Sequence, residues 1–158
     1  MIISTRLDFI QPPIQNIGKN GQRLYELLDD YGFEWCDKGV WRRRLVRKGY
    51  KTDLASVPWA FGIASALGFS PYGAHEGGAI LHDAGYQKLG DFGPGESMFL
   101  VNGQWVDENR HWTRLDCDNL FKQMCILGGM DPVHAEAEFL ALRVGALSSR
   151  NGVDWYFS

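Results

Sequence analysis

Cysteine is scarce in this chain of 158 residues, and long apolar runs are absent. The three cysteines, Cys36, Cys117 and Cys125, form no CxxC pair and are too few and too scattered for a disulfide framework, which favours a reducing compartment. No stretch approaches the roughly 20 apolar residues of a membrane-spanning helix, and the N-terminus lacks the apolar core of a signal peptide. We therefore expect a cytosolic chain without a membrane span.

An excess of positive charge is also absent, because the net charge is −3 at pH 7. The overall charge therefore provides no strong nucleic-acid signal. Residues 42–44 are a local exception, three successive arginines followed by Arg47 and Lys48. In a strand the first and third arginines share one face and the second points to the other. We expect a solvent-exposed hairpin here. The alternative is an anion-binding patch, although no Gly-rich phosphate loop accompanies it.

The size and the hydrophobic content of 45% suit a single domain over residues 1–158. The N-terminal third has the pattern of strands. Residues 24–35 mix aromatic and aliphatic side chains around a turn signal at 29–32, and residues 36–39 form a second turn signal before the alternating segment 40–46. This pattern predicts an antiparallel meander of three or four strands.

Helical patterns follow in the rest of the chain. We expect helices at residues 59–68, 74–88, 113–127 and 131 to about 147, from their apolar spacing and their Pro and Gly boundaries. An Asn-Gly pair within residues 98–106 predicts a β-hairpin. The fold class is therefore α+β, with the strand meander packed against a C-terminal set of three to four helices.

Three short polar segments adjoin apolar stretches, so a scaffold would hold each of them in place. They are residues 52–58 (TDLASVP), 82–83 (HD) and 114–118 (RLDCD). An Asp in a turn, a His-Asp pair and an Asp on a later helix can together hold one divalent metal or polarise one water molecule. The alternative is that they are buried polar struts.

His82 and Asp83 point about 100° apart on a helix, so one of them can ligate a metal while the other supports it. The alternative is a His hydrogen-bonded between helices and an Asp that faces solvent. His75 lies seven residues earlier, about 10 Å away along the same helix face, so His75 and His82 cannot bind one zinc ion. This spacing argues against the His-Asp phosphohydrolases.

Arg114 and Asp118 are four residues apart and share one helix face. They form either a surface ion pair worth a few tenths of a kcal/mol or a functional pair in which Arg114 holds the carboxylate of Asp118 in one rotamer. Asp116 points elsewhere and is expected to be exposed. Asp53 is either a turn-forming residue or a functional carboxylate at the mouth of a loop between a strand and a helix.

Three blocks of the chain resemble the DUF1353 family, small proteins of bacteriophages and prophages. They are residues 49–58, residues 79–86, and residues 118–121 followed by a final helix with residues 143–145 (RVG), and the resemblance spans about residues 23–147. Residues 88–112 depart from the family as a longer, Gly-rich insertion that contains tryptophan. A second departure is Ala84, where the family usually has Tyr. The resemblance implies a phage or prophage origin, a similar α+β fold, and a location in the cytoplasm of the bacterial host or in the virion. It implies no reaction.

Our first hypothesis is a small metal-dependent hydrolase that acts on a phosphoester or on a bacterial cell-wall bond. Its catalytic residues would be His82, Asp83, Asp118 and Arg114. Its ligands for a divalent ion such as Zn²⁺, Mn²⁺ or Mg²⁺ would be Asp53, His82, Asp83 and Asp118.

The second hypothesis is a non-catalytic virion or host-interaction protein, in which the polar cluster is a structural hydrogen-bond network. The chain has six tryptophans, and Trp105, Trp112 and Trp155 have the pattern of an exposed surface for a phage or host protein partner. A third hypothesis, a counter-defence or nucleotide-binding protein that uses Arg42, Arg44 and Lys48, has the least support. The oligomeric state does not follow from the sequence.

Overall fold

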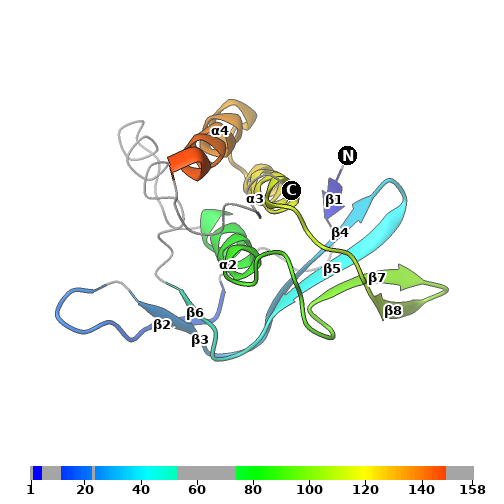
Figure 1. Ribbon diagram of the computed structural model, residues 1–158, viewed down its shortest axis with the longest axis horizontal. Helices are drawn as coiled ribbons and strands as arrows, with labels where there is room; N and C mark the ends of the chain where they lie inside the picture. Colours follow the sequence, from blue (N-terminus) through cyan, green and yellow to red (C-terminus); the bar gives the residue numbers. More distant parts are fainter. Residues whose placement is uncertain (1, 5–11, 23, 53–73, 149–158) are drawn as a thin grey trace.

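Strands precede most of the helices along the chain, and the two kinds of element form separate layers (Figure 1). The computed structural model describes residues 2–4, 12–22, 24–52 and 74–148. All strand pairs among the described residues are antiparallel. The expected α+β class is therefore confirmed. None of the helices that the structure describes is long and apolar enough to cross a membrane.

The strands form two sheets rather than one meander. The larger sheet has the order β1-β4-β5-β7-β8, and the smaller sheet has the order β2-β3-β6. The strands of the larger sheet are β1 (Ile2–Ser4), β4 (Tyr31–Asp37), β5 (Val40–Val46), β7 (Ser97–Val101) and β8 (Gln104–Asp107). Those of the smaller sheet are β2 (Ile14–Asn16), β3 (Tyr25–Leu27) and β6 (Lys51–Thr52).

Two tight turns with positive φ build the larger sheet. Lys38 and Gly39 have φ angles of 51° and 81° between β4 and β5, and Asn102 and Gly103 have φ angles of 48° and 79° between β7 and β8. Two successive left-handed residues are the signature of a type I′ turn, whose twist matches that of the strands. The predicted Asn-Gly hairpin is confirmed. This hairpin, within residues 88–112, forms one edge of the larger sheet.

Three helices are described, α2 (Ala74–Gln87), α3 (Arg114–Leu127) and α4 (Pro132–Ser148). Thr113 caps α3 through a reciprocal capping box with Asp116, so Asp116 is half-buried rather than exposed as predicted. Asp131 Oδ1 accepts the backbone N–H of Val133, which caps α4. These boundaries agree with the three predicted helices to within about two residues. The predicted helix at 59–68 lies outside the described residues.

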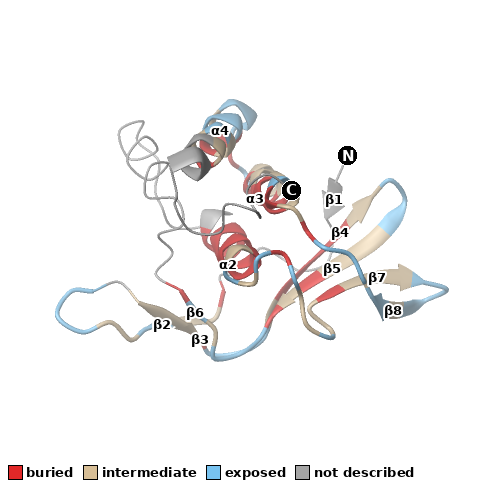
Figure 2. Ribbon diagram, viewed as in Figure 1, coloured by how far each residue is buried: buried red, intermediate tan, exposed pale blue. Residues whose placement is uncertain are grey.

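The core has two parts, and α3 contributes to both (Figure 2). One part lies between the strands and helices α2 and α3, around Phe33, Trp35 and Ile80. The other lies between α3 and α4, around Phe121 and Cys125. Since α3 packs on both neighbouring helices, a polar residue on its inner face is enclosed on all sides.

A glycine on α2 allows the close approach of α2 to α3. A Cβ atom added at Gly85 would lie 2.7 Å from Sγ of Cys117, which is closer than real Cβ contacts. The close contact between the two helices therefore requires glycine, whose side chain is a single hydrogen atom, at position 85. Their close packing brings the polar side chains one turn away within hydrogen-bonding distance.

The predicted solvent-exposed hairpin of arginines is wrong. Arg44 is 1% exposed, Arg43 Nε donates to Glu34 Oε1 at 2.8 Å, and Arg42 pairs with Glu108. The alternation of faces is nevertheless as expected, because Arg42 and Arg44 point toward the helices. Carboxylates and aromatic rings on other elements contact these arginines. The local charge pattern does not reveal those contacts.

Candidate functional site

The candidate site is a buried polar cluster between the three helices and the smaller sheet. His82, Asp83 and Tyr86 come from α2, Arg114 and Asp118 from α3, Arg143 from α4 and Thr52 from β6. His82, Asp83 and Asp118 are all less than 3% exposed. Four segments distant in sequence therefore converge on one imidazole and two carboxylates.

His82 lies between the two carboxylates. Its Nε2 is 2.8 Å from Oδ1 of Asp118, and its Nδ1 is 3.8 Å from Oδ1 of Asp83. The other oxygen of Asp83, Oδ2, accepts the hydroxyl of Thr52 at 2.6 Å. Because a carboxylate only accepts, Nε2 carries a proton toward Asp118. This contact fixes the orientation of the ring.

Asp118 accepts hydrogen bonds on both of its oxygens. The hydroxyl of Tyr86 donates to Oδ1 alongside His82, and Nη1 of Arg143 donates to Oδ2 at 3.0 Å. Three donors from two other helices thus hold one carboxylate that is completely inaccessible to solvent. Charge-assisted bonds of this kind compensate the cost of burying the charge.

Arg114 acts on Asp118 mainly through Tyr86. Its Nε donates to the Tyr86 hydroxyl at 2.5 Å and lies 3.8 Å from Oδ2 of Asp118, while its Nη2 donates to the backbone carbonyl of Leu142 at 2.7 Å. Arg114 therefore links α2, α3 and α4. The surface ion pair that the spacing allowed as an alternative is wrong, because Arg114 is 3% exposed.

The electrostatics of the cluster favour the charged forms of His82 and Asp118. Burial alone would lower the pKa of His82, but its hydrogen bond to Asp118 and the negative charges of Asp118 and Asp83 raise the pKa above its usual value. Burial alone would raise the pKa of Asp118, but His82, Tyr86 and Arg143 lower the pKa below its usual value. Burial, with the charge of Asp118 next, raises the pKa of Tyr86, so this hydroxyl remains a donor.

Nδ1 of His82 and Oδ1 of Asp83 have no hydrogen-bond partner among the described residues, and both are buried and lie 3.8 Å apart. Among the residues that the structure describes, no group of three His, Cys, Asp or Glu side chains is arranged to hold a metal ion. The described part of the chain therefore offers a pair of ligand atoms rather than a complete coordination shell.

The cluster contains four of the five predicted site residues. The structure brings His82, Asp83, Asp118 and Arg114 together, and the alternative in which Asp83 faces solvent is wrong. Asp53, which follows Thr52 directly, lies outside the described residues.

Sequence reasoning missed three residues of the cluster, Thr52, Tyr86 and Arg143. Tyr86 is one helical turn after His82, and this spacing is a signal that could have identified it. Arg143 comes from another helix, so no spacing within a single helix connects it with the site.

The predicted tryptophan-rich surface needs a correction. Trp112 is 3% exposed and packs its ring against Trp35 and Phe92 in the core, so it cannot serve as an exposed contact. Trp105 is half-buried beneath the guanidinium of Arg43, which lies 4.1 Å from the ring centre. Trp155 lies outside the described residues.

Comparison with known proteins identifies one family. The sequence model of the family DUF1353, described as a protein of unknown function, matches residues 25–142, about three quarters of the chain. The chain therefore belongs to this family, as the resemblance predicted. Neither the curated proteins nor the solved structures contain a significant match.

Proposed function

We propose that this member of the DUF1353 family is a small metal-dependent hydrolase, with His82 and Asp83 as two of the metal ligands. One observation carries the proposal. Nδ1 of His82 and Oδ1 of Asp83 are buried, face each other across 3.8 Å, and have no hydrogen-bond partner among the described residues. Two ligand atoms that each lie about 2.1 Å from one ion are about 3–4 Å apart, so the spacing suits a shared divalent cation.

Each proposed ligand already has a supporting partner. Asp118 accepts the Nε2 proton of His82, so a metal would bind at Nδ1 and displace the proton that the charged imidazole carries there, and Thr52 holds Oδ2 of Asp83. This carboxylate–imidazole arrangement is the usual support of a metal-binding histidine. Because both oxygens of Asp118 accept hydrogen bonds, we assign Asp118 to positioning His82. Asp53, the residue after Thr52, is the candidate for a third ligand.

The remaining residues would orient the substrate and the ligands. A divalent ion supplies Lewis acidity and lowers the pKa of a bound water to about 7. Arg143 has a side chain that is 33% exposed, so its guanidinium can meet an anionic group of the substrate while it holds Asp118. Arg114 keeps Tyr86 in place. Two substrate classes suit this chemistry, a phosphoester and a bacterial cell-wall bond.

Metal binding tests the proposal directly. Protein stripped with a chelator should bind about one Zn²⁺ or Mn²⁺ ion per chain, as measured by calorimetry, and its melting temperature should rise, because an ion that binds only the folded state stabilises it. Asp83→Asn and His82→Gln should lose most of this binding. Hydrolysis of bis-p-nitrophenyl phosphate and of purified peptidoglycan, with and without the ion, would then separate the two substrate classes.

The chain provides a matched control for adventitious binding. His111 and Asp91 form an exposed pair of the same chemistry, with Nδ1 of His111 2.9 Å from Oδ1 of Asp91. The variant His111→Ala should bind the same one metal ion per chain, with the same affinity as the wild-type protein. Equal binding by the wild-type protein and the Asp83→Asn variant, or no binding to either ion, would overturn the metal proposal.

A second candidate function is a non-catalytic phage virion or host-interaction protein. The specific observation in its favour is the closure of the network around Asp118, whose side chain is 0% exposed and bonded on both oxygens. The phage origin rests on the resemblance of the three sequence blocks to the family. Mass spectrometry of purified phage particles tests this candidate, since absence of the chain from the particles would argue against a virion role.

A further inference from the structure

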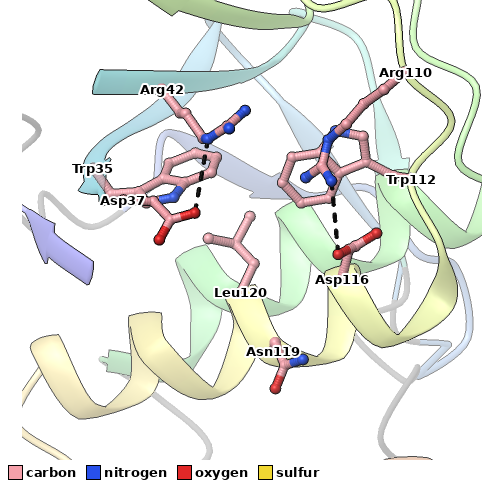
Figure 3. Close-up of a pocket in the computed structure, with 8 residues that line it drawn as sticks. All are labelled: Trp35, Asp37, Arg42, Arg110, Trp112, Asp116, Asn119 and Leu120. Atoms are coloured by element: carbon pink, nitrogen blue, oxygen red, sulfur yellow. Dashed lines mark ion pairs between the residues drawn. The ribbon is translucent and has the colours of Figure 1, made fainter. Parts of the chain in front are cut away.

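A second polar region of the molecule lies on another side of α3, away from His82. There a pocket of about 120 Å³ opens between α3 and the β4–β5 end of the larger sheet (Figure 3). Asp116, Asn119 and Leu120 line it from one face of α3, whereas Asp118 projects from the same helix toward α2 and α4. The pocket is therefore separate from the candidate metal site.

The pocket has an apolar floor and a charged rim. Trp35, Trp112 and Leu120 form the floor, and each is less than 7% exposed. The rim carries two pairs of opposite charge, Asp37 with Arg42 and Asp116 with Arg110. Asn119 also lines the pocket from α3. An apolar floor with a few converging polar groups is the usual form of a small-molecule site.

The two ion pairs on the rim are both too long for direct hydrogen bonds. Nε of Arg42 lies 3.9 Å from Oδ2 of Asp37, and Nη1 of Arg110 lies 3.9 Å from Oδ1 of Asp116. Moreover, Nε of Arg42 is buried and has no hydrogen-bond partner among the described residues. Each pair therefore leaves a guanidinium donor and a carboxylate acceptor that one inserted group can satisfy together.

A single residue behind the rim holds both arginines in place. Oε1 of Glu108 accepts from Nη1 of Arg42 and lies 3.1 Å from Nε of Arg110. The guanidinium of Arg110 also lies 4.5 Å from the ring centre of Trp112. Because these contacts fix the arginines, the donors that they present to the pocket are preorganised.

The charges of the rim select the chemistry of the ligand. An anion would meet Asp37 and Asp116, and a cation would meet Arg42 and Arg110, so neither would be well accommodated. A hydroxyl group both donates to a carboxylate and accepts from a guanidinium, so it matches each 3.9 Å gap. We infer that this pocket binds an uncharged, hydroxyl-rich ring, that is, one sugar unit, with the ring against Trp35 and Trp112 and its hydroxyls on the two ion pairs.

Titration with sugars tests the inference. The indole N–H signals of Trp35 and Trp112 in a ¹H–¹⁵N spectrum should shift with saturation on addition of glucose or N-acetylglucosamine, with millimolar affinity because the pocket holds only one ring. Asn119→Ala and Asp37→Ala should each weaken the affinity at least about tenfold, the effect of one lost hydrogen bond of about 1.4 kcal/mol. Gln123→Ala, on the same helix but outside the pocket, should leave it unchanged.

Two results would overturn the inference. One is the absence of saturable shifts with either sugar in the wild-type protein, whose folding the spectrum itself verifies. The other is saturable binding of inorganic phosphate or of lysine at these indoles in place of the sugars, which would assign the pocket to a charged ligand. The test does not depend on the metal site, since the chelated protein can be titrated in the same way.

Discussion

Two regions of the protein bury charge in different ways. In the helix cluster, formed by His82, Asp83, Asp118 and their partners, the buried charge of Asp118 has short hydrogen bonds to His82 and Arg143. The sheet cluster surrounds Arg44 with aromatic rings, and the guanidinium carbon lies 3.3 Å from the ring centre of Phe92 and 3.9 Å from that of Trp112. In the described part of the chain Nε and Nη2 of Arg44 have no hydrogen-bond partner.

The difference shows in the ionisation of the buried groups. In the helix cluster, hydrogen bonds and opposite charges outweigh burial, so His82 and Asp118 are stabilised in their charged forms. In the sheet cluster, burial outweighs the nearby charges and lowers the pKa of Arg44 to about 9. We therefore expect the charge to contribute most to the free energy of unfolding in the helix cluster, and the volume of the side chain to contribute most in the sheet cluster.

The largest expected effects are truncations in the two clusters, and the first of them is in the helix cluster. Asp118→Ala removes the acceptor of His82, Tyr86 and Arg143 and leaves buried positive charge uncompensated, so the free energy of unfolding should fall by about 3–5 kcal/mol. Urea denaturation measures it. Asp118→Asn keeps the shape and should be almost as costly, because the charge is lost. A loss below about 1 kcal/mol for Asp118→Asn would show that the charge is unimportant here.

At Arg44 the charge and the volume can be separated by two substitutions. Arg44→Ala should lower the free energy of unfolding by about 3–5 kcal/mol, as truncations of large buried side chains do. Arg44→Met keeps most of the volume and removes the desolvation cost, so it should cost less than about 1 kcal/mol. The comparison between the two clusters would fail if the Met and Ala variants were equally unstable in urea denaturation.

The smallest expected effect concerns Gly85. It tests the close packing of α2 against α3, on which the helix cluster depends. In Gly85→Ala the new methyl group would lie 2.7 Å from Cys117 Sγ, and overpacking of this kind costs about 1–3 kcal/mol. The higher helix propensity of Ala stabilises the folded state by about 1 kcal/mol, so we expect a small net loss of stability. The matched control is Gly78→Ala, where the nearest atom is Phe121 Cδ2 at 3.2 Å. A Gly85→Ala variant that is more stable than the control variant would contradict this interpretation.

Much of the fold was predictable because its signals are local. The period of two along β5 placed Arg42 and Arg44 on one face, the Asn-Gly pair predicted the β7–β8 hairpin, and the apolar spacing of residues 113–127 predicted α3. The division of the strands into two sheets was not predictable. It depends on which distant strands pair, as when β7 joins β5 across the intervening helix.

The candidate site was predictable in its residue types but not in its connections. His82, Asp83, Asp118 and Arg114 were selected as acidic, basic or imidazole groups beside apolar segments, and they do converge. Arg143 was not predicted as a site residue, because its contact with Asp118 comes from the packing of α4 on α3. The burial of Arg44 and Trp112 was not predicted, because the rings and carboxylates around them come from other elements.

The sequence by itself determined the α+β class, most element boundaries and the family, since these follow from side-chain period, capping residues and short motifs read along the chain. Only the tertiary structure decided which charges are buried, which oxygen of each carboxylate is bonded, and which donor and acceptor atoms remain for a ligand. The physical reason is that burial and hydrogen bonding are set by contacts between distant segments, and local patterns do not encode those distances.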